Sequence, residues 1–436
     1  MADTSKHHLS LIEIISLGIG TMIGAGIFAL FGSISDLAGG YAWLAFAASA
    51  IISASAGYGY AVLARSASTN GGIAEYLDIG WQGGLTGRTI AFCYYLSIAV
   101  VLGLVAKSFG HYTTKVLSLG DGAVLWLGIA VMLLFLLVNA LGLRLLGLSE
   151  KLMVGAKLLV LVGFTIVAFT QFDFATYAQN SGSVAFNAGD FVNAVALANL
   201  SFAGFAVIAN AGGSVKEGAG TIGRAIFIAI ALVAVIYISL DIAVFGSIDL
   251  SRIEKAKDYA LAEAATPILG QAGFLLLGIT AMVSTATNIN ANIFSGSNTI
   301  SYMAKERELS PILSRQIFLR QGNIAMIATV VIVIVMLISM NLEQIGDVAS
   351  LTFLLVHTFV PMGAALHVAR GQGRGNATLL WLAAILNAGV MVFFAYHLIG
   401  DNTLELYVFA GLVAFSLVFC TISKAVIDRQ GAGDHH

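Results

Sequence analysis

Charged side chains are scarce in this sequence. Asp, Glu, Lys and Arg make up 10% of the 436 residues, 58% are hydrophobic, and the mean hydropathy is +0.92. A soluble domain of this length needs far more polar surface than these residues supply, so the composition excludes one. The sequence instead predicts an all-α polytopic membrane protein, because long apolar runs form membrane-spanning helices.

Cysteine, proline and enzyme motifs are also scarce or absent. Cys93 and Cys420 lie in apolar segments far apart in the sequence, so we interpret both as small hydrophobic residues without a disulfide. With 3 prolines against 48 glycines, helix irregularity depends mostly on glycine. No HExxH, GxSxG or Walker A sequence occurs, so we predict no enzyme, no catalytic residue, no metal and no cofactor.

Hydropathy divides the chain into membrane spans of about 20 residues. Twelve segments meet this requirement: 11–35, 41–64, 86–117, 122–141, 149–171, 190–212, 223–247, 269–302, 324–340, 346–369, 378–398 and 403–425. With the N-terminus inside, fifteen Lys and Arg residues fall in cytoplasmic loops and five outside. This pattern predicts that both termini lie in the cytoplasm. We expect the membrane to be the inner membrane of a prokaryotic cell.

Glycine interrupts the first segment, where residues 18–28 contain four glycines. A break in lipid leaves backbone N–H and C=O groups without partners unless protein or a bound solute satisfies them. Transporters bind substrate at such breaks, whereas close packing through small residues is the ordinary structural explanation. A second irregular stretch, residues 199–205, lies five segments later and favours the functional interpretation.

The offset of five segments between the two irregular stretches predicts an inverted repeat. The first five-helix repeat would cover residues 1–172, and the second would cover residues 173–370. Two further helices would follow in residues 371–430, and we interpret residues 431–436 as a tag remnant.

Lys157 is the cation left over from the loop count, because it lies near the middle of the fifth segment. A lysine at the bilayer centre costs about 2.5–3.5 kcal/mol on insertion scales, so a buried one normally has a role. Desolvation disfavours its charged form, so its protonation could change during a transport cycle. The alternative is a lysine that covers a helix end with its stem and reaches the interface.

Other polar groups at membrane depth are open to two interpretations. Asp241 could be a second proton site, or it could reach the headgroups. The eighth segment is strongly polar, and Ser284, Thr287 and Asn288 share one face of it. That face suits ion or water coordination, although hydrogen bonding between helices explains it equally well. We interpret His357 as a packed core residue.

Three motifs resemble the amino acid–polyamine–organocation (APC) superfamily of transporters. They are GTMIGAGIF at residues 20–28, FAGF at residues 202–205 with TIGRAI at residues 221–226, and SYMAKERELSP at residues 301–311. The likeness covers essentially the whole chain in order. It is greatest to the ApcT-type proton-coupled amino acid transporters, because Lys157 matches their lysine on the fifth helix.

The resemblance implies a LeuT-type fold of two inverted repeats whose first and sixth helices are broken around the substrate. A substrate carboxylate would meet backbone N–H groups near Ala25 and Gly26, and a substrate ammonium would meet carbonyls near Ile23 and Phe202. The other residues implied at this site are Gly24, Ala203, Gly204 and Phe205. For proton coupling, Lys157 would lie near the Gly20 carbonyl and Ser284.

The resulting hypothesis is a secondary active transporter that imports amino acids by alternating access and is coupled to protons through Lys157. Thr287, Asn288 and Asp241 form a candidate secondary polar site. A proton-independent exchanger of amino acids or polyamines is the first alternative, and an ion-transporting or channel-like protein is the second. The expected partners are an amino acid, protons and the lipid bilayer, with no nucleic acid.

Overall fold

The computed structural model describes residues 10–67, 71–142, 148–183, 185–210, 220–319, 322–401 and 403–433. These ranges form a bundle of long α-helices, as predicted. Ten described helical stretches are long and apolar enough to cross a membrane, and two shorter apolar helices cover Leu11–Met22 and Ile324–Ser339. The chain is therefore an all-α, multi-pass membrane protein, while the count of twelve spans and the inverted repeat stay predictions.

The first half of the chain follows the expected segments closely. Its elements are α1 (Leu11–Met22), the π-helical turn η1 (Ile23–Ile27), α2 (Phe28–Ala38), η2 (Gly39–Tyr41), α3 (Ala42–Ala64), α4 (Ile73–Trp81), α5 (Leu85–Val116), α6 (Ala123–Ala140), α7 (Leu148–Thr170) and α8 (Phe174–Ser183). The short helices α4 and α8 lie between the expected spans, and hydropathy did not predict them.

The second half adds one small hairpin to the helices. Its elements are α9 (Ala188–Phe202), α10 (Phe205–Asn210), α11 (Gly220–Phe245), α12 (Leu250–Lys255), η4 (Lys257–Tyr259), α13 (Ala260–Lys305), η5 (Pro311–Ser314), β1 (Gln316–Phe318), β2 (Gly322–Asn323), α14 (Ile324–Ser339), α15 (Leu342–Ala369), α16 (Ala377–Asp401) and α17 (Thr403–Gly433). Strands β1 and β2 pair antiparallel, with Gln316 opposite Asn323.

Side chains at the helix starts explain several boundaries. Ser10 accepts a hydrogen bond from the Glu13 N–H, and the Glu13 carboxylate accepts one from the Ser10 N–H, which forms a capping box at α1. Asn341 and Gln344 form the same box at α15. Within α13, Gly270 has φ +65° and divides a short first part from the long helix that follows. The long part therefore begins close to the expected residue 269.

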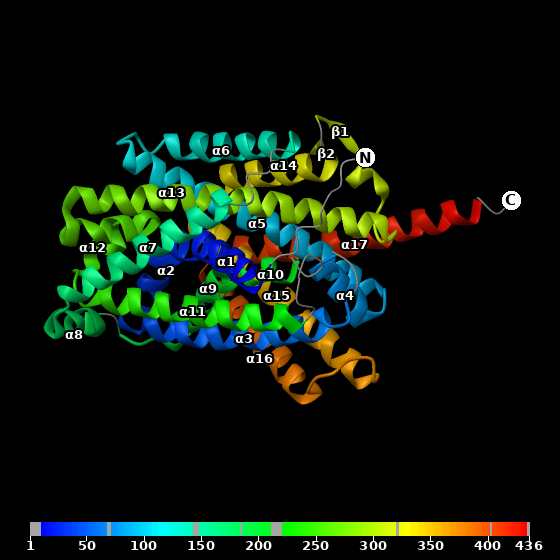
Figure 1. The fold of residues 1–436 in the computed structure, drawn as a ribbon, viewed down its shortest axis with the longest axis horizontal. Helices are drawn as coiled ribbons and strands as arrows, with labels where there is room; N and C mark the ends of the chain where they lie inside the picture. Colours follow the sequence, from blue (N-terminus) through cyan, green and yellow to red (C-terminus); the bar gives the residue numbers. More distant parts are fainter. Residues whose placement is uncertain are drawn as a thin grey trace.

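The bundle has a buried centre and two distinct ends. Helix α5 is buried along its whole apolar window, whereas α6, α16 and α17 expose most of theirs and lie at the periphery. The short helix α4, the β-hairpin and the end of α17 lie at one end of the bundle, and α8 and α12 lie at the other (Figure 1). We call these the α4 end and the α8 end.

Parts of three expectations lie outside the described residues. They are positions 1–9 of the first expected repeat, residues 211–212 at the end of the sixth expected span, and positions 434–436 of the expected tag. The side chain of Ala25 is also outside the description, although its backbone belongs to η1.

Candidate transport site

The interruption of the first span is a π-helical turn. Residues Ile23–Ile27 form η1 between α1 and α2, and the helix is not unwound into an extended gap. A π turn shifts the backbone pairing from i→i+4 to i→i+5, so it disturbs the partners of nearby carbonyls. The regular helix is therefore interrupted where the glycines are, by a change of winding.

Three successive carbonyls just before this turn accept hydrogen bonds from side chains of three other helices. The Lys157 ammonium on α7 donates to the Gly20 carbonyl at 2.5 Å. Asn288 on α13 donates to Thr21 at 2.9 Å, and Tyr237 on α11 donates to Met22 at 2.9 Å. The disturbed backbone thus obtains partners from distant parts of the chain, as burial in lipid requires. We refer to these three as the carbonyl ladder.

The interruption of the sixth span lies between α9 and α10. Helix α9 ends at Phe202, and α10 begins at Phe205 after the two-residue turn Ala203-Gly204. The hydrogen bonds around this turn join residues three apart: the Ala206 N–H donates to the Ala203 carbonyl at 3.0 Å, and the Val207 N–H donates to the Gly204 carbonyl at 3.1 Å. The interruption expected in the sixth segment is therefore present.

The two interruptions pack against each other through glycine. A methyl group added at Gly26 would lie 2.5 Å from the Ser201 Cα, and one added at Gly204 would lie 2.4 Å from the Met22 nitrogen. Backbone meets backbone at both points, so only hydrogen fits there. The glycines thus allow close packing of the two interrupted helices at the same place where substrate binding is expected.

A small cavity lies beside this crossing. Its volume is about 20 Å³, and its lining includes Met22, Ala203, Gly204, Asn288 and Phe353. That is room for about one water molecule. In the conformation described, α1 and α10 would have to separate before an amino acid could fit between them.

Lys157 is buried, with 3% of its surface exposed. A second small cavity, of about 10 Å³, lies beside it and is lined by Gly20, Val154 and Thr287 among others. The Ser284 hydroxyl is fully buried and has no hydrogen-bond partner among the described residues. The Lys157 ammonium therefore lies beside the Gly20 carbonyl, where the resemblance placed it. It makes no hydrogen bond to the Ser284 hydroxyl.

The candidate secondary polar site divides into two places. Asn288 belongs to the carbonyl ladder, and Thr287 lines the cavity beside Lys157 while donating to the Ser284 carbonyl at 2.9 Å. Asp241 lies elsewhere on α11, buried to 1% exposure, and faces the Trp43 backbone in the first turn of α3. The nearby Tyr177 on α8 places Asp241 toward the α8 end, so the structure does not group it with Asn288.

Residues that hold α10 in place were not anticipated from the sequence. The Asn210 amide donates to the Tyr94 hydroxyl at 2.8 Å and to Ser295 at 2.7 Å, and its oxygen accepts from the Ile73 N–H at 3.0 Å. Tyr76 donates to the Ala209 carbonyl at 3.0 Å. Helices α4, α5 and α13 thus close the bundle over α10 on the α4 side. The sequence feature that could have indicated these contacts is the position of Asn210 near the end of the sixth expected span.

Lys257 connects helices at the α8 end of the bundle. Its ammonium lies 2.8 Å from Asp36 on α2 and 3.0 Å from Glu343 on α15. Its backbone also covers α2, where a methyl group added at Gly32 would overlap the Lys257 carbonyl. Contacts at both the α4 end and the α8 end therefore separate the candidate site from either side of the bundle.

Burial also changes a carboxyl group at the α4 end. Glu308 follows α13 and has 3% of its surface exposed. This burial, together with the neighbouring Asp78, raises the pKa of Glu308 from 4.5 to about 8. The folded state therefore binds a proton that the unfolded state releases, so stability falls as the pH rises from about 4.5 to 8.

We expect Glu308→Gln to remove most of this pH dependence. At pH 8.5 the variant should be more stable than the parent protein by about 2–4 kcal/mol, because its side chain carries no charge to bury. Thermal unfolding in detergent at pH 6 and pH 8.5 measures the difference. The exposed neighbour Glu306→Gln serves as the control and should leave the pH dependence as it is. An equal pH dependence in Glu308→Gln would contradict the assignment.

Comparison with known proteins agrees with this architecture. The amino acid permease family model matches residues 9–425. The inner membrane transport protein YbaT of Escherichia coli (strain K12) is 31% identical over 419 residues, which are 95% of this chain and 96% of YbaT. The serine/threonine exchanger SteT of Bacillus subtilis (strain 168) is 23% identical over 383 residues, or 85% of each chain.

A eukaryotic relative extends the comparison. The high-affinity methionine permease of Saccharomyces cerevisiae is 25% identical over 325 residues, which are 70% of this chain and 55% of that permease. The match to the family model includes both interruptions and α7, the helix between them that carries Lys157. The chain belongs to the amino acid permease family of the APC superfamily.

Proposed function

We propose that this protein is a proton-coupled amino acid symporter that works by alternating access. The observation that carries the proposal is the hydrogen bond from the buried Lys157 ammonium to the Gly20 carbonyl, three residues before the π turn. The protonated amine makes a charge-assisted hydrogen bond between α7 and α1, and loss of the proton removes the charge and weakens this bond.

Substrate recognition is assigned to the two interruptions. The backbone N–H groups of Ala25 and Gly26 would bind the substrate carboxylate, since helix N-termini favour anions. The carbonyls of Ile23 and Phe202 would accept from the substrate ammonium. Gly24, Ala203, Gly204 and Phe205 complete the proposed site. Main-chain groups recognise what all amino acids share, which accords with the different amino acids in the names of the relatives.

Coupling follows from the carbonyl ladder. Protonated Lys157 ties α7 to α1, and α1 must move for the site to open. A proton shifts this balance only through a difference in affinity for the two conformations, so deprotonation would favour the one in which the tie is broken. The small cavity lined by Thr287 and Lys157 would hold a water molecule that exchanges protons with the amine.

The arrangement of the repeats and the orientation belong to the same proposal. Residues 1–172 and 173–370 would be inverted repeats, each contributing one interrupted helix to the shared site, with residues 371–430 outside them. The positive-inside pattern would place the α4 end, with Lys305, Arg307 and Arg315, in the cytoplasm of a prokaryotic cell.

A proton-independent exchanger is the second candidate. One observation favours it: SteT, similar over 85% of its length, is named a serine/threonine exchanger. An exchanger needs substrate on both sides, whereas a symporter accumulates substrate along a proton gradient. The two functions therefore separate in one assay.

We expect proteoliposomes containing the purified protein to accumulate radiolabelled amino acid when the outside is more acidic than the inside. The gradient should raise the initial uptake by about tenfold or more, and replacing sodium with potassium should have no effect. Empty liposomes and a proton ionophore are the controls. Uptake that needs internal substrate and ignores the gradient would establish the exchanger instead.

A further inference from the structure

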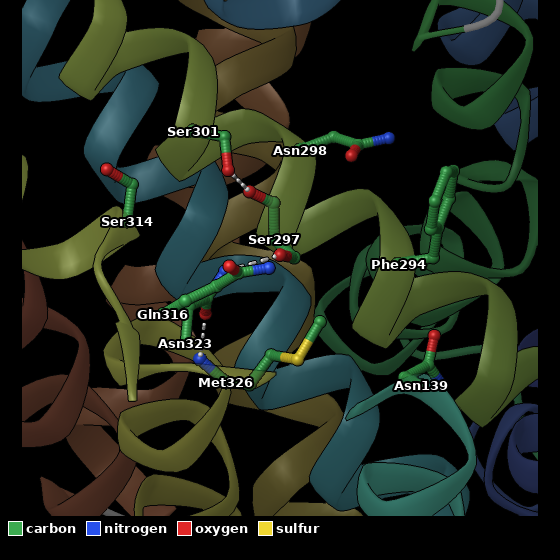
Figure 2. A pocket seen from close by; sticks show the side chains of 9 residues that line it. All are labelled: Asn139, Phe294, Ser297, Asn298, Ser301, Ser314, Gln316, Asn323 and Met326. Carbon is green, nitrogen blue, oxygen red and sulfur yellow. Dashed lines mark hydrogen bonds between the residues drawn. The ribbon is translucent and has the colours of Figure 1, made fainter. Parts of the chain in front are cut away.

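A polar cavity of about 350 Å³ lies at the α4 end, apart from the candidate transport site. Its lining comes from α6, α13, η5, the β-hairpin and the start of α14 (Figure 2): Asn139, Phe294, Ser297, Asn298, Ser301, Ser314, Gln316, Asn323 and Met326. Ser297 follows Asn288 by nine residues, which is two and a half turns of α13. The cavity thus faces the side of α13 opposite to the carbonyl ladder, at a size typical of ligand sites, about 300–1,000 Å³.

The described lining carries hydroxyl and amide groups and no charged side chain. Asn139 is held by two hydrogen bonds from its nitrogen, to the Phe135 carbonyl at 2.8 Å and to the Asn290 oxygen at 2.9 Å. No described residue donates to the Asn139 side-chain oxygen, which is therefore oriented as an acceptor. Figure 2 shows this side chain at the edge of the space, opposite the residues of the hairpin.

Ser297 has the complementary role. Its hydroxyl accepts a hydrogen bond from the Asn323 amide at 2.9 Å, so its own hydrogen can be donated to a ligand. Ser301 donates to the Ser297 carbonyl at 2.7 Å, which leaves the lone pairs of the Ser301 hydroxyl as acceptors. An alcohol both donates and accepts, so several adjacent alcohol groups match this alternation of donors and acceptors better than a carboxylate or an ammonium does.

One side of the cavity is apolar, because Phe294 on α13 lines it and is exposed. Exposed apolar side chains also occur on the other elements that line the cavity: Leu137 on α6, and Ile317 and Leu319 in the hairpin. The cation Lys305 ends α13 one turn after Ser301. Apolar side chains followed within a turn by cations mark the level of the lipid headgroups.

We propose that this cavity binds the polyol group of a membrane lipid, with the alcohol groups of the headgroup inside and the acyl chains along α6 and α13. The hydroxyl and amide groups inside the cavity match the alcohol groups of the headgroup. The exposed apolar side chains on the surrounding elements match the acyl chains. A free polyol offers the same alcohol groups without the chains. The site is independent of amino acid transport.

The test compares two anionic lipids that differ in their alcohol groups. Phosphatidylglycerol has two in its headgroup, and phosphatidylmethanol, with the same phosphate, has none. Native mass spectrometry of the intact protein in a detergent without sugars, with each lipid titrated, gives apparent dissociation constants. We expect phosphatidylglycerol to bind at least about tenfold more tightly, since several hydrogen bonds distinguish the two. Ser297→Ala and Asn139→Leu should reduce this preference to about twofold or less.

Ser339→Ala is the matched control, because it removes an exposed hydroxyl from the far end of α14. It should leave the preference intact, and retained amino acid uptake should show that the cavity variants are folded. A second arm adds free glycerol. Competition by glycerol supports the polyol site, and binding of glycerol without phosphatidylglycerol identifies a soluble polyol as the occupant. Equal binding of the two lipids without glycerol binding, or an unchanged preference in both cavity variants, would overturn the inference.

Discussion

Lys157→Ala is expected to abolish the accumulation of amino acid driven by a proton gradient. The substitution removes the only described side-chain donor to the Gly20 carbonyl and, with it, the titratable group of the proposed coupling site. Gradient-driven uptake in proteoliposomes should fall by at least about tenfold, because the proton no longer distinguishes the two conformations. Exchange of labelled for unlabelled substrate should be reduced far less, since the proposed substrate site uses backbone groups of other helices.

The difference between the two assays separates a coupling role from a structural one. A merely structural lysine would affect accumulation and exchange alike. Lys255→Ala is the control, because Lys255 is an exposed cation at the end of α12 and should leave both assays unchanged. Full gradient-driven accumulation in Lys157→Ala would remove the proposed role of this residue.

Gly204→Ala is expected to damage both folding and transport, although it adds a single methyl group. The added methyl group would lie 2.4 Å from the Met22 nitrogen and 2.9 Å from the Met22 Cα, so the backbones of α1 and α10 would have to move apart. Overpacking of this kind costs about 1–3 kcal/mol or more, and at this position it also displaces the carbonyl ladder. We expect a lower free energy of unfolding in detergent and loss of uptake.

Gly163→Ala is the matched control for this substitution. Gly163 lies in α7, the helix of Lys157, and a methyl group added there would meet nothing within 4 Å. Alanine favours a helix over glycine by about 1 kcal/mol, so this variant should be as stable as the parent protein or slightly more so. Equal stability and equal uptake in the two variants would show that the close contact between the interruptions is not required for folding or transport.

The α4 end illustrates what escaped prediction from the sequence. Helix α4 is too short and too polar to be a membrane span, and its importance lies in contacts with α10 from more than a hundred residues away. The sequence did not single out Asn210, because the partners of an amide cannot be derived from its neighbours in sequence. The polar residues of α13 likewise separate only in the structure, where Asn288 donates to α1 and Ser297 lines the cavity on the opposite side of the helix.

The sequence by itself determined the class of protein, the approximate limits of the spans and the positions of the two interruptions. These properties depend on hydropathy over about 20 consecutive residues and on glycine, which act locally. Only the tertiary structure decided that the first interruption is a π turn and which groups complete it. Lys157, Tyr237 and Asn288 come from three other helices, more than a hundred residues along the chain. The reason is physical: in lipid every disturbed carbonyl must find a donor, and which donor is near depends on how the helices pack.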